Sequence, residues 1–241
     1  MAEPSAPSKR YKKPVLIEIF AECVLTPGTL PVPRFFDTVP RLKARGFTDI
    51  EMIGNVQMTA NEGPSMQPRI RCWSADRRQL IQIAEDLVIV NLIGDYPGWR
   101  PFIELFELGM RDIVGAENAI KVLNLSTIDR FTVPSDLYVL ERYVNCGGEL
   151  VPAWYRGSKH PLDITLGHGV VREEGWNRQV NVKVRRRDGI TIEFRVTLQR
   201  TLGSKGRWQD TLHELHMEAN GIFEALITDT TRKDIMEGLV L

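Results

Sequence analysis

The sequence predicts an α+β protein built from two tandem, similar halves, each an antiparallel sheet packed on a long helix. Short runs that alternate apolar and polar residues, typical of half-buried strands, follow one another with turn residues between them. Each half then ends in a longer segment with apolar residues at helical spacing. A glycine followed five residues later by a tryptophan, Gly94–Trp99 and Gly203–Trp208, precedes both long helices.

Composition is that of an ordinary globular protein and limits the partners that we expect. Of 241 residues, 43% are hydrophobic and 26% charged, and the 31 Lys and Arg balance the 31 Asp and Glu. Proteins dedicated to nucleic acid usually carry a basic excess, so this balance favours other roles. The chain lacks a run of about 18 apolar residues, and we therefore expect no membrane partner.

Cysteine usage predicts a cytoplasmic protein. The three cysteines, Cys23, Cys72 and Cys146, are odd in number and widely spaced. No two of them form a CxxC pair, so reduced thiols are favoured over a disulfide framework. We expect small core residues at these positions, with no metal and no cofactor bound.

The first half is predicted to span residues 14–117, after a flexible tail at 1–13 that is rich in Pro, Ala, Ser and basic residues. Its apolar patterns predict a first strand, a helix interrupted or shortened by Pro40, and a second strand. A polar loop is predicted at 58–68, followed by three strands and a long helix. The elements expected in order are 14–25, 34–47, 48–56, 69–74, 79–85, 87–93 and 99–114.

The second half is predicted to span residues 118–241. It begins with a long strand at 119–131 and a short helical or extended segment at 135–144. Two further strands are expected at 149–155 and 163–171, before a hairpin and a long helix at 207–227. The chain then closes in a short capped turn or helix at 228–241, for which Thr228, Asp229 or Thr230 is the expected N-cap.

The hairpin at 180–200 has the clearest pattern in the chain. In its first strand, valines at 180, 182 and 184 alternate with polar residues, and Ile190 to Leu198 alternate in the same way. Asp188-Gly189 supplies the turn, so one face is predicted to be buried and the other solvated. The earlier strand at 87–93 is apolar on both faces except at Asn91, and we expect it to be covered on both sides.

A short internal match suggests duplication. Residues 92–99, LIGDYPGW, align with 201–208, TLGSKGRW, at an offset of 109 residues. The glycine lets the chain leave the sheet, and the indole anchors the helix that follows. The alternative is two similar strand-to-helix connections within one α+β domain.

Several motifs resemble a sporadically distributed family of uncharacterised prokaryotic proteins of about this length, known only by a numbered family model. The motifs are RIRCWSADRRQLIQIAEDLVIVNL, YPGW, RYVN and ANGIFEALITDTTRKDIMEG. The matching positions are Trp73, Leu80, Ile81, Gln82, Ile83, Asp86, Asn91, Tyr96, Pro97, Tyr143, Val144, Asn145 and Phe223. The sequence departs from the family pattern at Ala84-Glu85, Val88 and Leu92. The resemblance implies an α+β fold and a prokaryotic or phage origin, and it implies no reaction.

Four polar residues are candidate ligand contacts. His213 and His216 lie three residues apart on the predicted long helix, a spacing that allows two side chains to share a metal, but no third ligand is indicated. His168 lies between two glycines, where a general base and a loop or bulge histidine are both open. Asn145 precedes a glycine pair, where it either satisfies backbone groups at a turn or contacts a ligand.

Basic residues around the hairpin at 180–200 form the candidate surface for nucleic acid or a partner. They are Arg178, Lys183, Arg185, Arg186, Arg187 and Arg195. Glu193 interrupts this group, and the solvated positions carry no aromatic residue on which bases could stack. A solvated sheet face that meets an acidic partner is the favoured interpretation, and its charge also opposes edge-to-edge aggregation.

The function that these patterns favour is a non-enzymatic intracellular binding or adaptor protein. It acts through a protein partner or as a homo-oligomer, and the patchy occurrence of the resembling family suggests a prokaryotic defence or toxin–antitoxin type module. One alternative is a nucleic-acid-binding subunit that uses the Arg-rich hairpin 178–200. Another is a small-ligand-binding protein or hydrolase with a site between sheet and helix.

Overall fold

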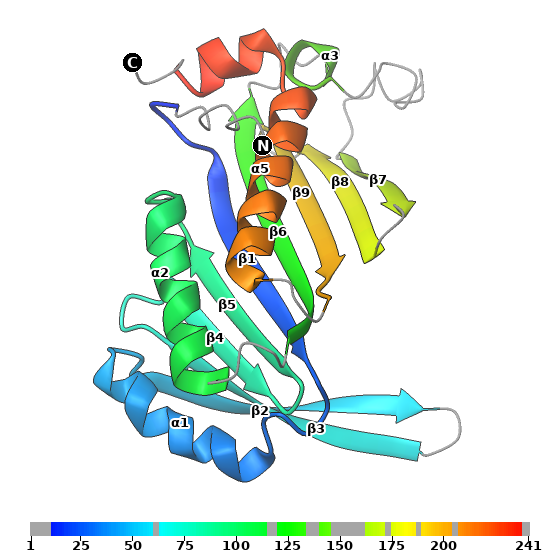
Figure 1. The fold of residues 1–241 in the computed structure, drawn as a ribbon. Coiled ribbons are helices and arrows are strands. Elements are labelled where there is room, and N and C mark those ends of the chain that lie inside the picture. The colour runs from blue at the N-terminus through cyan, green and yellow to red at the C-terminus, as the bar shows by residue number, and fades with distance from the viewer. Residues whose placement is uncertain are drawn as a thin grey trace. The chain divides into compact units, whose positions relative to one another are not determined.

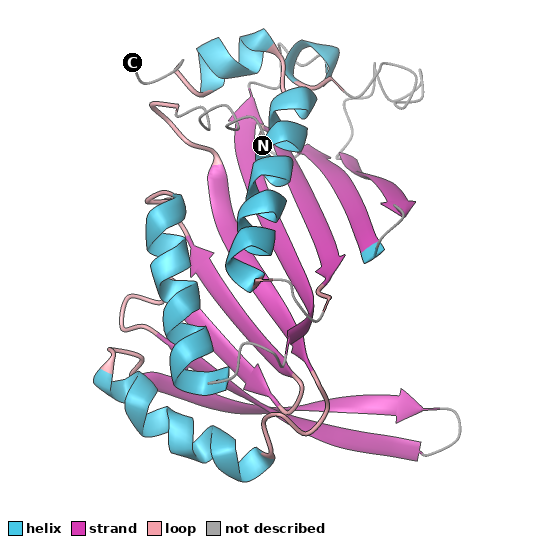
Figure 2. Ribbon diagram, in the orientation of Figure 1, coloured by secondary structure: helices cyan, strands magenta, loops and turns pink. Residues whose placement is uncertain are grey.

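The computed structural model describes residues 11–59, 63–114, 120–133, 140–145, 162–171, 175–186, 189–203 and 207–237. Within these residues the chain is α+β, as predicted, with helices packed on an antiparallel sheet (Figures 1 and 2). The strand expected at 149–155 lies outside the described residues, as do Cys146 and Arg187.

The described strands form one sheet in the order β2-β3-β4-β5-β1-β6-β9-β8-β7. Their bounds are β1 Leu16–Leu25, β2 Asp49–Thr59, β3 Gly63–Trp73, β4 Gln79–Ala84, β5 Leu87–Ile93, β6 Ile120–Val133, β7 Leu162–Val171, β8 Trp176–Arg186 and β9 Ile190–Thr201. The helices are α1 Val32–Ala44, α2 Trp99–Gly109, α3 Leu140–Tyr143 and α5 Trp208–Leu226, with single π-turns at Met110–Val114 and Thr231–Ile235.

The chain divides into two compact units that are discontinuous in sequence. Unit 1 combines residues 1–17, 126–198 and 213–241, and unit 2 combines 18–125 and 199–212. In each unit the helices lie over one face of the strands (Figure 2). The tandem halves 14–117 and 118–241 therefore remain a prediction.

In unit 2, helices α1 and α2 cover one face of the sheet. The buried residues of β1 on that face alternate along the strand, and Cys23 Sγ lies 3.6 Å from Met110 Sδ just beyond α2. Gly109 allows α2 to approach β5 closely, because a Cβ at this position would lie 3.1 Å from a Val90 methyl group. Burial of Val88 through Leu92 confirms that β5 is covered on both faces.

The polar loop predicted at 58–68 is wrong. Strand β2 continues to Thr59 and β3 begins at Gly63, and the two pair from Asp49–Trp73 to Thr59–Gly63. The turn-forming residues Gly63, Pro64 and Pro68 suggested a loop, but cross-strand pairing overrides these local preferences. Likewise, Pro40 does not split α1, which runs from Val32 to Ala44.

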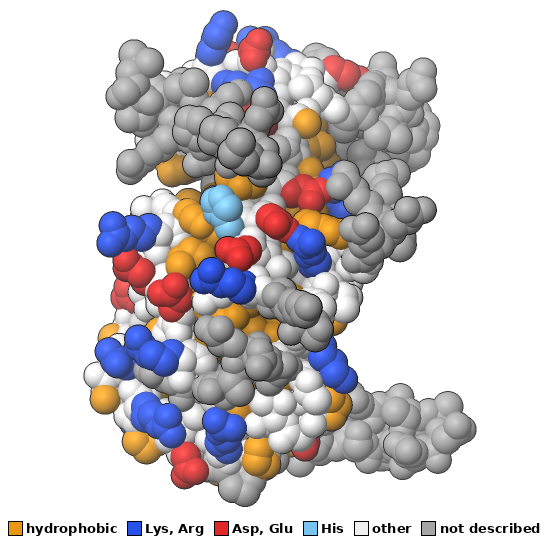
Figure 3. All heavy atoms as spheres, viewed as in Figure 1, with side chains coloured by type: hydrophobic (Ala, Val, Ile, Leu, Met, Phe, Trp, Pro, Cys, Tyr) orange, Lys and Arg blue, Asp and Glu red, His pale blue; other side chains and the backbone are white. Residues whose placement is uncertain are grey.

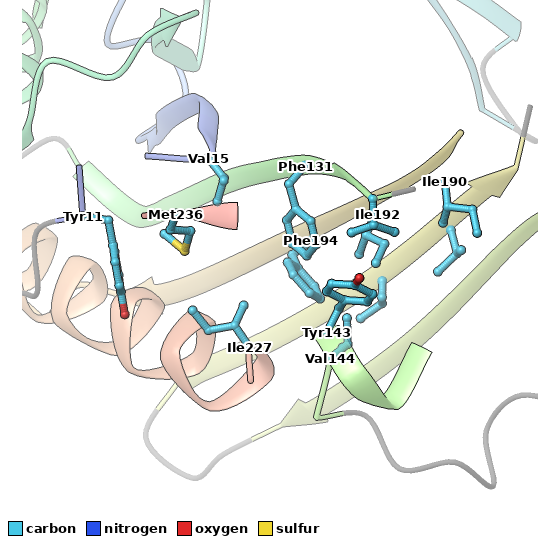
Figure 4. Packing of buried hydrophobic residues seen from close by; sticks show 13 residues of the cluster. Tyr11, Val15, Phe131, Tyr143, Val144, Ile190, Ile192, Phe194, Ile227 and Met236 are labelled. Atoms are coloured by element: carbon cyan, nitrogen blue, oxygen red, sulfur yellow. The ribbon is translucent and has the colours of Figure 1, made fainter. Parts of the chain in front are cut away.

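Unit 1 is built on the alternation predicted for the hairpin, and burial confirms it. Ile192, Phe194 and Val196 are fully buried, whereas Arg195 is exposed and its neighbours on the same face are half-buried. Phe194 lies at the centre of the core (Figure 4), with its ring centroid 5.9 Å from that of Phe131 on β6 and 6.2 Å from that of Phe223 on α5. These contacts hold α5 on the sheet.

The two ends of the described chain join this core. Tyr11 is 7% exposed and belongs to the same cluster, and the Lys13 backbone N–H donates to the Met236 carbonyl at 3.2 Å. Tyr11 and Lys13, which belong to the tail predicted at 1–13, therefore contact the core of unit 1, because the Tyr11 ring supplies apolar area that the alternation pattern does not include.

Replacing Phe194 tests this packing. Phe194→Ala is expected to lower the free energy of unfolding by about 3–5 kcal/mol, because it opens a cavity among three rings. Arg195→Ala, one residue along on the opposite face, is the matched control and is expected to change it by less than about 0.5 kcal/mol. Urea denaturation followed by circular dichroism measures both values, and equal effects at the two positions would contradict the assignment of faces.

Candidate functional site

The two histidines of α5 occupy different environments. His213 is exposed, whereas His216 is 6% exposed and its Nε2 accepts a hydrogen bond of 3.1 Å from the Asn220 side-chain amide. Burial, together with the nearby His213, lowers the pKa of His216 to about 4, so its imidazole is neutral at pH 7. No group of three or more His, Cys, Asp and Glu side chains in the described residues is placed to hold a metal.

Asn145 closes the C-terminal end of α5. Its side-chain amide donates to the carbonyls of Ala225 at 3.2 Å and Ile227 at 2.9 Å, and its backbone N–H donates to Leu226 at 2.8 Å. The last carbonyls of a helix have no partner within the helix, so these bonds cap it. The sequence left open whether Asn145 bonds to backbone groups at a turn or contacts a ligand. In the structure its side chain bonds to backbone carbonyls.

Two threonines that follow α5 bond to the last carbonyls of α3, next to this cap. Thr231 Oγ1 donates to the Tyr143 carbonyl at 2.6 Å, and Thr228 Oγ1 donates to the Arg142 carbonyl at 2.5 Å. Val144 also forms an isolated bridge with Ile227. The RYVN and TDTT motifs, which lie far apart in sequence, thus form one structural clamp at the end of α5.

A partly buried polar cluster ties the segment around Tyr11 to the same region. The Tyr11 hydroxyl donates to Glu224 at 2.7 Å, and Arg232 bonds to the Glu224 carboxylate and backbone. Burial and the hydrogen bond to Glu224 raise the pKa of Tyr11 to about 12. Every charge in this cluster has a partner, as expected for a structural rather than a reactive group.

The six basic candidates do not form one cluster. Arg178 of β8 forms an ion pair with Glu218 of α5, so it lies on the helix side of the strand. Lys183, Arg185 and Arg195 lie on the opposite side of β8 and β9, because neighbouring residues of a strand point to opposite faces. Arg186 ends β8 with its side chain outside the described atoms.

We call Lys183, Arg185 and Arg195 the basic face. Arg185 and Arg195 are exposed and Lys183 is half-buried. On the same side Glu193 accepts two hydrogen bonds from Arg130, at 3.0 and 2.6 Å, which neutralise the acidic residue that interrupts the pattern. By contrast, acidic and basic side chains mingle around α5 on the helix side shown in Figure 3. The described basic residues of the hairpin thus gather on the sheet face opposite α5, where Asp163 of β7 pairs in register with Arg185.

His168 lies in β7, where it pairs with Val180 of β8. It thus lies within the strand expected at 163–171, and its side chain lies outside the described atoms. Thr165, also in β7, pairs with Lys183 and is exposed at the edge of the basic face.

Sequence reasoning missed one buried acid, Asp129 of β6. It is 5% exposed, has no hydrogen-bond or ion-pair partner among the described residues, and burial raises its pKa to about 7. Asp129 is an even number of residues from Leu123, Leu125 and Phe131, so it lies on the same face of β6 as these apolar residues. That spacing is the sequence signal that could have identified it as buried. A protonated, neutral carboxyl group is the form that this environment favours.

A row of polar side chains crosses four strands of unit 2, on the face away from α2. Arg71 donates to Gln82 at 3.4 Å, Gln82 to Asn91 at 3.3 Å, and Asn91 to Glu18 at 2.8 Å. Gln82 and Asn91 are both more than nine-tenths buried, so the row satisfies polar groups that would otherwise be costly. It explains the two polar residues that interrupt the apolar strands β4 and β5.

No protein-family model and no curated protein sequence matches this chain. No helix in the described part of the chain is long and apolar enough to cross a membrane.

Removing the Asn145 side chain tests its capping role. Asn145→Ala is expected to lower the free energy of unfolding by about 1–2 kcal/mol, because two carbonyls at the helix end lose their donor. Hydrogen exchange should accelerate in the last turn of α5 and hardly at all at its first turn. Full retention of stability and of amide protection would contradict this role and favour a ligand contact.

Asp129 and His216 give opposing dependences of stability on pH. In the unfolded chain Asp129 loses its proton near pH 4, whereas in the folded state it keeps the proton up to about pH 7. Between these pH values the folded state binds more protons, so the contribution of Asp129 to the free energy of unfolding falls as pH rises. His216 is neutral in the folded state down to about pH 4 but protonated below about 6.5 when unfolded, so it raises stability as pH rises. The two contributions largely cancel between about pH 4 and 6.5.

Single substitutions separate these contributions. In Asp129→Asn the free energy of unfolding is expected to rise with pH over this window, by roughly 1.4 kcal/mol per unit, and in His216→Gln to fall by a similar slope. Urea denaturation at several pH values measures both slopes, with wild type as reference. Parallel profiles for all three proteins would show that neither group titrates as described.

Proposed function

We propose that this protein is a non-enzymatic, cytoplasmic binding or adaptor protein that acts through a protein partner or through self-assembly. A prokaryotic defence or toxin–antitoxin type module is the context suggested by the family that the sequence resembles. One observation carries the proposal: α5 covers one face of β8 and β9, while the opposite face presents Arg185 and Arg195 to solvent.

A flat, rigid strand surface suits protein recognition. The exposed guanidinium groups project from paired strands whose other face is packed core, so they lose little backbone freedom on binding. Arginine forms bidentate bonds with carboxylates and is enriched at protein interfaces. We therefore propose an acidic protein surface as the partner of the basic face.

Nucleic acid is the second candidate, favoured by the exposure of Arg185 and Arg195 on one face. Against it stand the balanced charge of the chain and the composition of this face, where the described positions of β8 and β9 are polar and carry no aromatic ring. Double-stranded binding through phosphate contacts alone would depend strongly on salt.

Internal duplication is part of the same proposal. Outward from the middle of the strand order, β1, β5, β4 and β3 on one side correspond to β6, β9, β8 and β7 on the other. Helices α2 and α5 begin at Trp99 and Trp208, the two tryptophans of the internal match. Gly94 adopts a positive φ of 88° whereas Gly203 does not, so the two connections differ in detail.

Charge reversal on the basic face tests the proposed function. The double variant Arg185→Glu/Arg195→Glu is expected to reduce capture of the partner from host lysate about tenfold or more, because like charges then oppose each other. The matched control is Arg100→Glu/Arg207→Glu, which makes the same charge change at two exposed arginines of unit 2. Affinity capture with quantitative mass spectrometry measures the ratio, with and without nuclease.

Nuclease-resistant capture that is lost in the first variant and kept in the control supports a protein partner. Material that disappears on nuclease treatment supports nucleic acid instead. Equal capture by both variants and wild type would contradict a role for the basic face.

A further inference from the structure

The long hairpin of β2 and β3 extends beyond the other strands of unit 2. β2 pairs with β3 over its whole length, but β3 pairs with β4 only from Ile70 to Trp73 (Figure 1). We call the part beyond Ile70, residues 53–59 and 63–69, the arm. A two-stranded ribbon is only marginally stable in water, so the arm gains from the addition of a further strand.

The β3 edge of the arm is poorly suited to such pairing. Pro64 and Pro68 lie opposite Met58 and Gly54 of β2. A proline has no N–H, so within a ladder it takes positions whose nitrogen points away from the paired strand. Pro64 and Pro68 are an even number of residues apart, so both nitrogens point to the same, outer edge of β3. That edge therefore lacks two of the N–H donors that a new strand would need.

The β2 edge has the opposite character. β2 is the last strand in the sheet order, is 11 residues long and contains no proline. From Met52 to Thr59 it carries no charged residue, and Met52 is 61% exposed. In the strand order of the described residues, β2 has a paired strand on one side only. Long edges with few charges and a row of unpaired backbone groups are sites of strand addition.

The prolines also fix which groups of β2 point outward. Residues opposite Pro64 and Pro68 form non-hydrogen-bonded pairs, so Met58 and Gly54 direct their own N–H and C=O groups to the open edge. Because the strand has a period of two, Met52 and Val56 do the same. The open edge thus offers an evenly spaced set of donors and acceptors.

We propose that the β2 edge pairs with the β2 edge of a second copy of this chain, antiparallel and around a twofold axis. The distribution of charge along β2 is compatible with a second copy in this arrangement. β2 carries its acids, Asp49 and Glu51, only at its beginning, where Arg77 forms ion pairs with both. With the axis at Gly54, Asp49 faces Thr59 of the second copy and Glu51 faces Gln57, so no two acids meet.

This pairing deepens the self-assembly part of the proposed function and does not involve the basic face. It joins two sheets through their ends, and the twofold axis closes the assembly at a dimer. Pairing of β2 with the other edge strand, β7, would instead be head-to-tail and would give a larger ring or an open filament.

Sedimentation of the purified full-length protein over a range of concentrations tests the proposal. Wild type is expected to form a dimer and nothing larger. Val56→Pro removes one outward N–H without breaking a bond to β3, and Met52→Lys places a charge on the edge. Each is expected to raise the dimer dissociation constant about tenfold or more, because the twofold axis repeats every change.

Thr165→Lys, on the edge strand β7, is the matched control and should leave the dimer intact; circular dichroism and thermal unfolding verify that each variant is folded. A wild-type protein that stays monomeric, an assembly that grows beyond the dimer, or dissociation by Thr165→Lys would each overturn the proposal. The measured mass depends on this protein alone, so this result is independent of partner capture at the basic face.

Discussion

The burial of one face of β6, β8 and β9 beneath α5 is the constraint on which unit 1 depends. Phe194 is fully buried there, and its ring meets Phe131 on the neighbouring strand and Phe223 on the helix. Once that face is covered, strand geometry directs every intervening residue to the other side. The solvent exposure of Arg185 and Arg195 is thus a consequence of the core, and the basic face exists because the valines and aromatic residues lie beneath the helix.

Buried polar groups in this protein have two different consequences. The Gln82–Asn91 row and the Tyr11–Glu224–Arg232 cluster are bonded within themselves, so they add specificity to the packing. Asp129 instead sits in the core as an acid without a partner among the described residues. Its cost is modest while it stays protonated, and the neutral His216 on α5 opposes its effect on stability as pH changes. Unit 1 therefore tolerates two buried ionisable groups without a steep dependence on acidity.

The α+β class and the faces of the hairpin were predictable because a strand has a period of two and local sequence reports it directly. The arm was not, because Gly63, Pro64 and Pro68 resemble a loop until β2 is known to lie beside them. The ion pair of Arg178 with Glu218 and the cap formed by Asn145 also depend on which distant elements meet. Spacing alone shows that Asn145 ends a segment, but only the fold shows that a helix terminus lies against it.

The most direct test of the account is a cysteine scan along β9. Each residue from 190 to 198 is replaced in turn by cysteine in a Cys146→Ser background, and the rate of labelling by a water-soluble maleimide is measured under native conditions. Cys23 and Cys72 are buried and burial raises the pKa of both thiols, so they contribute little background. Slow labelling is expected at even positions and fast labelling at odd positions, with position 195 fastest. Rates that do not alternate, or that are fastest at position 194, would contradict it.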